Sequence, residues 1–182
     1  KKTTEIYPND YRAYNNLGEL AFAAGDAAKA ESYFKQAASK NANAPEVNAN
    51  LGLCELVKGN VAAAESYLGK ATGANAANEA LGNLYIKQGQ YDRAVNAFGD
   101  AKTNSAAQAQ ILAKDYNKAK ATLSAIKNPD AMTDYLMAIV GARTNNASLV
   151  SSSIKSAIAK DASMAQRAAN DREFAKFADS IK

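Results

Sequence analysis

The chain has 182 residues, of which 42 are alanine and one is cysteine, while histidine and tryptophan are absent. Without histidine neither a Ser-His-Asp nor a Cys-His catalytic arrangement can form, and a single cysteine excludes an intramolecular disulfide framework and a cysteine-rich zinc site. The 22 basic and 18 acidic residues give a formal net charge of +4, but they are interspersed, which is typical of solvated helix faces rather than of a nucleic-acid-binding patch. We therefore expect no catalytic residues, no cofactor or metal, and no nucleic-acid partner.

Abundant alanine, with only three prolines, predicts an all-α fold of closely packed helices. No stretch approaches the roughly 18 apolar residues that a bilayer span needs. We therefore expect no direct insertion of this chain into a membrane.

The first elements in chain order repeat one another. A Leu-Gly pair is followed seven residues after its glycine by a second glycine, and then by a block with Ala, a large apolar residue and Ala. The first blocks are Leu17–Gly25, Leu51–Gly59 and Leu81–Gly89, and the second blocks are Ala30–Ala37, Ala64–Ala71 and Ala94–Ala101. Identical offsets at a period of about 30 to 34 residues predict repeated helix-turn-helix units.

Two glycines of each unit have different expected roles. The glycine of the Leu-Gly pair lies inside a helix, where it costs about 1 kcal/mol relative to alanine, so we expect the second helix to pass too close for a Cβ atom. The second glycine is expected to end the first helix in a left-handed conformation. Asp26 and Asn60 are then expected to cap the following helices, with Gln90 a poorer cap.

The ends of the chain show weaker versions of the pattern. Residues 1–7 followed by Pro8 indicate the tail of a preceding helix, so we expect a C-terminal portion of a longer protein. A short helix at 105–113 and a second at 114–126 precede a break at 128–130. A fifth pair is expected at Ala131–Arg143 and Ala147–Lys160. A final amphipathic helix is expected at Ser163–Ile181, with Phe174 and Phe177 covering the last apolar face.

This pattern resembles the tetratricopeptide repeat (TPR) family, strongly over 11–104 and weakly over 105–162. The resemblance implies a right-handed all-α solenoid that forms one continuous domain. Its expected segments are a repeat tail at 1–10, repeats at 11–44, 45–74 and 75–104, a degenerate short repeat at 105–130, a degenerate helical pair at 131–162 and a capping helix at 163–182.

A narrower resemblance concerns three stretches, Ile6–Gly18, Asn96–Ser105 and Leu112–Ala119. They look like the C-terminal TPR region of OmpA-like or lipoprotein envelope proteins of Gram-negative gut anaerobes. That resemblance implies a location in the bacterial cell envelope, periplasmic or associated with the outer membrane.

TPR arrays bind peptides in a groove formed by their first helices, and the repeat register assigns residues to that groove. The candidates are Asn15, Glu19, Phe22, Ala49, Leu53, Leu56, Glu79, Asn83, Ile86 and Lys87. The alternative for the apolar members is packing between repeats, and for the polar members it is plain solvation.

Chaperone-binding members of the family hold a C-terminal carboxylate with basic side chains and asparagines. Here Asn15 and Glu19 stand at the lysine and asparagine positions of that clamp, and only Asn50 matches it. Since a glutamate repels a carboxylate, binding of Hsp70 or Hsp90 tails is not expected. The groove instead suits a neutral or weakly charged peptide.

Two other features have competing interpretations. Cys54 aligns with Leu20 and Leu84, so it is expected to be a buried apolar residue rather than a reactive thiol. Tyr7, Tyr11 and Tyr14 form either a packing surface or an aromatic recognition patch. The sequence therefore predicts a non-catalytic scaffold that binds a protein or peptide. The alternative is a module for self-association or for docking within its own chain.

Overall fold

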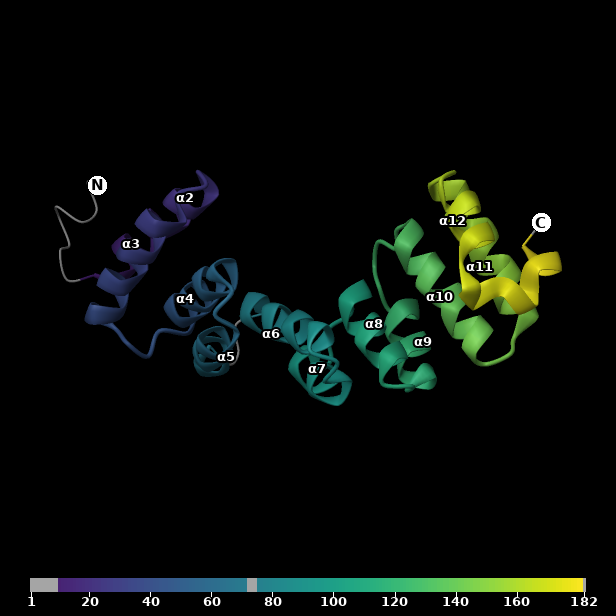
Figure 1. Ribbon diagram of the computed structural model, residues 1–182, viewed down its shortest axis with the longest axis horizontal. Helices are drawn as coiled ribbons and strands as arrows, with labels where there is room; N and C mark the ends of the chain where they lie inside the picture. Colours follow the sequence, from purple (N-terminus) through teal and green to yellow (C-terminus); the bar gives the residue numbers. More distant parts are fainter. Residues whose placement is uncertain (1–9, 72–74, 182) are drawn as a thin grey trace. The chain divides into compact units, whose positions relative to one another are not determined.

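The computed structural model describes residues 10–71 and 75–181, and all regular structure in these two ranges is helical. Figure 1 shows the order of the helices along the chain. The chain forms two compact units that divide between Leu81 and Gly82, within helix α6. The expected all-α class is confirmed for the described ranges.

The first unit contains the helices of the first two sequence repeats and the start of α6. These helices are α2 (Tyr11–Ala23), α3 (Ala27–Lys40), α4 (Pro45–Lys58), α5 (Val61–Lys70) and α6 (Asn75–Lys87). Helix α2 packs against α3, and α4 packs against α5 and α3. The expected tail at residues 1–7 and Pro8 lie outside the described residues.

The turns between paired helices follow the glycines. Gly25, Gly59 and Gly89 have φ angles of 83°, 80° and 74°, the left-handed conformation that costs a glycine no steric penalty. Asp26 caps α3 as expected, since its side chain accepts a hydrogen bond from the Lys29 backbone N–H.

The expected cap at Asn60 is wrong. Its side chain makes no capping hydrogen bond to α5, and its Nδ2 atom instead donates to Glu55 Oε2 at 2.8 Å. The carboxylate of Glu55 is a charged acceptor on the preceding helix and forms the stronger hydrogen bond. Gln90 likewise makes no capping hydrogen bond to α7.

The glycines inside the first helices lie under large side chains of the second helices, as expected. A Cβ atom at Gly52 would lie 2.7 Å from Leu68 Cγ, and one at Gly18 would collide with the Phe34 ring. Phe34 and Leu68 are buried. Close approach of the paired helices thus depends on the missing Cβ atoms.

The second unit begins at Gly82 in α6 and continues to the C-terminal segment. Its further elements are α7 (Tyr91–Phe98), α8 (Asn104–Leu112), α9 (Tyr116–Ser124), α10 (Ala131–Arg143), α11 (Ala147–Lys160), α12 (Met164–Asn170) and η1 (Arg172–Ser180). Helix α8 packs against α9, and α10 packs against α11. The short first helix and the fifth helical pair are confirmed.

The single final helix expected over Ser163–Ile181 is wrong. The segment forms a short α-helix, α12, and the 3₁₀ segment η1, which is itself kinked at Phe177. The two meet at an extended Asp171. Asp171 Oδ1 accepts a hydrogen bond from the Glu173 backbone N–H at 2.9 Å, and Oδ2 accepts one from the Tyr135 hydroxyl at 2.5 Å. Holding Asp171 as the cap of η1 prevents it from continuing α12.

The two phenylalanines of the C-terminal segment lie where the sequence predicts them, in the core. Phe174 is 1 % exposed and its ring meets that of Tyr135 edge to face, with centroids 5.5 Å apart. Phe177 and Ile154 belong to the same buried cluster. The segment thus covers the apolar side of α10 and α11 despite its break.

A lysine takes the place of glycine at the turn before α9. Lys114 has a φ of 65°, so replacing it by glycine should raise the free energy of unfolding by roughly 0.5–1 kcal/mol. A left-handed conformation costs about 1–2 kcal/mol with a Cβ atom, and the greater freedom of glycine in the unfolded chain offsets part of the gain. Urea unfolding followed by circular dichroism measures the change.

Asn145, at φ 55°, is the control. Because asparagine tolerates this conformation, its replacement by glycine should raise the free energy of unfolding less. An unchanged or lower stability of Lys114→Gly would contradict the expectation.

Candidate functional site

A small pocket of about 140 Å³ opens between α2 and α4 of the first unit. The side chains that line it are Glu19, Phe22, Ala23, Phe34, Asn50 and Leu53. Phe34 comes from α3 and is 1 % exposed, so it forms the floor. Its ring reaches this position because Gly18 carries no side chain.

One wall of the pocket is a hydrogen-bonded polar group. Asn50 Nδ2 donates to Asn15 Oδ1 at 3.0 Å and to Glu19 Oε1 at 3.2 Å, and Asn15 Nδ2 donates to the same Glu19 oxygen at 3.0 Å. Asn15 is buried, whereas Glu19 is exposed. The two amides therefore hold the Glu19 carboxylate in a fixed position at the surface.

The other wall is apolar and partly open. The Phe22 residue is 36 % exposed, and Leu53 is half-buried. Together with the Phe34 floor, these side chains leave apolar surface in contact with solvent beside a charged group. Pockets of this kind bind by burying an apolar group while a few polar groups set its orientation.

Three of the expected groove residues line this pocket, namely Glu19, Phe22 and Leu53, and a fourth, Asn15, is hydrogen-bonded to Glu19. Ala49 is instead 5 % exposed and belongs to a core cluster with Leu68, against which Leu56 also packs. Ala49 thus offers a ligand little surface, whereas Leu56 is half-buried.

The remaining expected residues lie on α6. Glu79 stands in the part of α6 that belongs to the first unit, and Asn83, Ile86 and Lys87 stand in the part that belongs to the second. Ile86 is half-buried and the other three are exposed. None of the four is among the described residues that line the pocket.

Asn50 lines the pocket, although the groove assignment did not include it. The repeat register placed Ala49 in the groove, but the next residue supplies the pocket wall. The available signal was the match of Asn50 to an asparagine of the chaperone-type clamp, which by itself did not indicate contact with Asn15 and Glu19.

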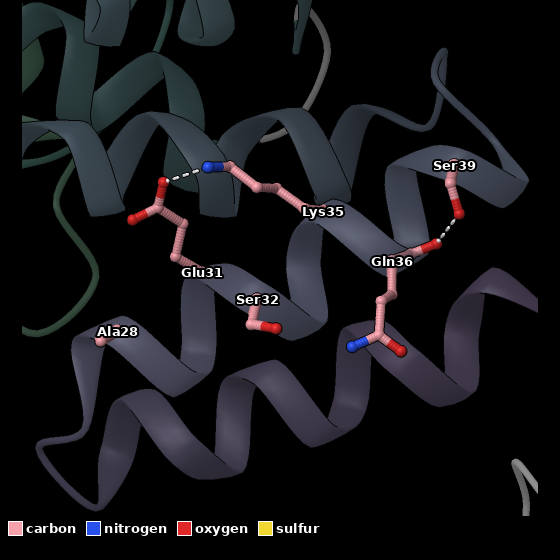
Figure 2. A pocket seen from close by; sticks show the side chains of 6 residues that line it. All are labelled: Ala28, Glu31, Ser32, Lys35, Gln36 and Ser39. Atoms are coloured by element: carbon pink, nitrogen blue, oxygen red, sulfur yellow. Dashed lines mark hydrogen bonds and ion pairs between the residues drawn. The ribbon is translucent and has the colours of Figure 1, made fainter.

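A larger hollow of about 570 Å³ runs along the outside of α3, and all its described lining residues lie on that helix. Figure 2 shows Glu31 facing Lys35, and the Ser39 hydroxyl, which donates to the Gln36 carbonyl oxygen at 2.6 Å. Hydrogen bonds from Lys35 and Lys58 lower the pKa of Glu31. The two charged side chains that line the hollow, Glu31 and Lys35, pair with each other. This outer face of α3 serves below as the control.

Cys54 is buried at 2 % exposure, which confirms its expected packing role. Burial raises the pKa of its thiol to about 11, so the thiolate needed for nucleophilic chemistry does not form at neutral pH. Within residues 10–71 and 75–181, no group of three or more His, Cys, Asp or Glu side chains is placed to hold a metal ion. No helix of that part of the chain is both long and apolar enough to cross a membrane.

The tyrosines near the start of α2 pack within the first unit. Tyr11 and Tyr14 lie against the core cluster that contains Phe34 and Cys54. The Tyr11 hydroxyl also donates to Glu46 Oε1 at 2.6 Å, which lowers the pKa of that carboxyl and raises the pKa of the tyrosine. Tyr11 and Tyr14 thus join α2 to its neighbours, and Tyr7 lies outside the described residues.

Comparisons with known proteins agree with this repeated helical arrangement. Two family models, both described as tetratricopeptide repeat, match residues 21–85 and 76–106. No curated protein is significantly similar to the chain.

Several solved structures share the fold. A tetratricopeptide repeat protein from Parabacteroides merdae is 17 % identical, with a TM-score of 0.73 over 94 % of this chain and 76 % of its own. YrrB, described as a TPR protein with an unusual peptide-binding site, is 18 % identical, with a TM-score of 0.68 over 92 % of this chain and 95 % of its own. PilW, described as a widely conserved type IV pilus biogenesis factor, is 20 % identical, with a TM-score of 0.68 over 96 % of this chain and 86 % of its own.

At these identities the likeness concerns the fold and not the ligand. The chain therefore contains tetratricopeptide repeats over residues 21–106, and its fold is that of tetratricopeptide-repeat solenoids.

Proposed function

We propose that the chain is a non-catalytic scaffold that binds a protein or peptide on the first helices of its repeats. The observation that carries this proposal is the open pocket in which Phe22 and Leu53 face a fixed polar wall at Glu19 and Asn50. YrrB, which shares the fold, is described as having a peptide-binding site. The other candidates that we propose as ligand contacts, Glu79, Asn83, Ile86 and Lys87, lie on α6.

We further propose that this scaffold acts in the bacterial cell envelope. The support is the resemblance of Ile6–Gly18, Asn96–Ser105 and Leu112–Ala119 to the repeat region of envelope proteins. PilW, a further protein with this fold, is described as a pilus biogenesis factor. Fractionation of the source cells would test the location, and recovery in the cytoplasmic fraction alone would contradict it.

Selection of a random-peptide display library on the chain tests the binding site. Selected peptides should bind the Leu53→Asn variant at least about tenfold more weakly. The change removes apolar contact surface, where burial of one side chain contributes about 1.5–3 kcal/mol, and it leaves the charge of the pocket unchanged. Isothermal titration calorimetry with the selected peptides measures this loss.

The matched control is Gln36→Ala on the outer face of α3, which should leave peptide affinity unchanged. Phe22→Ala is a second pocket variant that removes a more exposed side chain, and it should weaken the same peptides. Circular dichroism verifies that each variant is folded. Equal affinity of the native chain and of both pocket variants would refute the proposed site.

Self-association is the second candidate function, and Leu20 favours it. Leu20 is 69 % exposed, although it aligns with Cys54 and Leu84, which are 2 % and 6 % exposed. Leu20 is therefore a large apolar side chain that is exposed at a position buried in the next repeats. Such an exposed apolar side chain offers a surface that another helix could cover. Sedimentation velocity over a range of concentrations separates the two functions. A monomer at all concentrations would exclude self-association of this chain.

A further inference from the structure

We propose that the pocket between α2 and α4 selects a peptide segment in which a Lys or Arg stands one or two residues from an apolar side chain. This inference rests on the proposed function, and it replaces the neutral peptide expected from the sequence with a cationic one. The apolar side chain would enter the pocket, and the cation would pair with Glu19.

The first helices of this unit are acidic although the chain as a whole has a net charge of +4. Helices α2 and α4 and the part of α6 up to Leu81 carry four glutamates but only two basic residues, Arg12 and Lys58. Both basic side chains are already paired. Arg12 contacts Asp10 at 2.8 Å, and Lys58 contacts Glu55 at 2.6 Å.

No ion pair of the described residues neutralises Glu19 in this way. The ion pairs found within residues 10–71 and 75–181 join a lysine or an arginine to other carboxylates. The hydrogen bonds that Glu19 accepts come from the neutral amides of Asn15 and Asn50, and both reach Oε1. These amides fix the carboxylate without neutralising it, and Oε2 is left to accept a charged donor from a ligand.

The pocket limits the apolar part of the ligand. Its volume of about 140 Å³ is close to that of the roughly 150 Å³ apolar cavities that accept one benzene ring. One side chain of the size of Leu, Ile, Met or Phe therefore fills it.

The spacing between the two ligand groups follows from the position of Glu19 in the pocket lining. Because the same carboxylate lines the pocket, the cation must stand close to the apolar side chain. In an extended segment each residue advances about 3.3 Å, which places the cation one or two positions away. An acidic residue or a C-terminal carboxylate at that place would be repelled.

The selected display library tests this inference through its sequences and through charge changes at Glu19. Peptides enriched on the native chain should carry Lys or Arg one or two residues from an apolar residue. Their affinity should fall about fivefold with Glu19→Gln and at least tenfold with Glu19→Lys, and should weaken with added salt. Selection on the Glu19→Lys variant should enrich Asp or Glu at the same place. Glu31→Gln, the same change on the outer face of α3, should leave affinity unchanged.

Two contrary results have different meanings. Peptides that depend on Leu53 but lack a cation, or that bind Glu19→Lys as tightly as the native chain, would overturn the inference and leave the proposed function standing. A selection that yields no peptide sensitive to Leu53→Asn would overturn the proposed function, and the inference with it.

Discussion

Replacement of Phe174 by alanine should lower the free energy of unfolding of the second unit by about 3–5 kcal/mol. Phe174 is 1 % exposed in the cluster formed with Tyr135, Ile154 and Phe177, and removal of a buried aromatic ring forfeits its transfer energy and leaves a cavity. Amide hydrogen exchange resolved along the chain measures the loss, which should be largest in α10, α11 and the C-terminal segment.

Tyr135→Phe is a smaller change in the same buried cluster and should destabilise the second unit less than Phe174→Ala. It keeps the ring that meets Phe174 and removes only the hydroxyl that donates to Asp171. Because the acceptor is charged, the expected cost is about 1.5–3 kcal/mol. A cost below about 1 kcal/mol for Phe174→Ala would show that the C-terminal segment does not stabilise the second unit.

The second large effect is expected at Gly18. Gly18→Val should destabilise the first unit by about 2–3 kcal/mol, because the new side chain would occupy the space of the Phe34 ring and overpacking of a filled core forces side chains out of their preferred conformations. Since Phe34 is also the pocket floor, the same variant should weaken the peptides selected on the native chain. Urea unfolding and calorimetry measure the two effects.

Gly69 provides the matched control for Gly18. It also lies inside a helix, α5, but a Cβ atom there would meet nothing within 4 Å. Gly69→Ala should therefore raise stability by up to about 1 kcal/mol, the difference in helix propensity. If both replacements were stabilising, the close approach of α2 and α3 would not require glycine.

Much of the fold was predictable because the decisive signals are local. A glycine at a fixed offset from a Leu-Gly pair marks each turn, and the φ angles of Gly25, Gly59 and Gly89 follow from the lack of a Cβ atom. The burial of Phe34 and Leu68 opposite Gly18 and Gly52 follows from the same repeat.

The candidate site was predictable only in part, because a helix turns about 100° per residue. The repeat register that placed Asn15 and Glu19 in the groove also placed Ala49 there, yet Ala49 packs into the core and Asn50 lines the pocket. One residue of difference in position moves a side chain from one face to the next. The packing of α4 on its neighbours decides which of the two is exposed.

The sequence by itself determined the helical class, the repeat period, the turns and the small residues at which paired helices touch, since each depends on backbone conformation and side-chain size at neighbouring positions. The tertiary structure decided what depends on residues far apart in the chain. Asn50 joins Asn15 across 35 positions, Leu20 is exposed where the aligned Cys54 is buried, and the bond from Tyr135 to Asp171 divides the last helix. In each case the same local pattern allows more than one environment, and packing against another helix selects the one that forms.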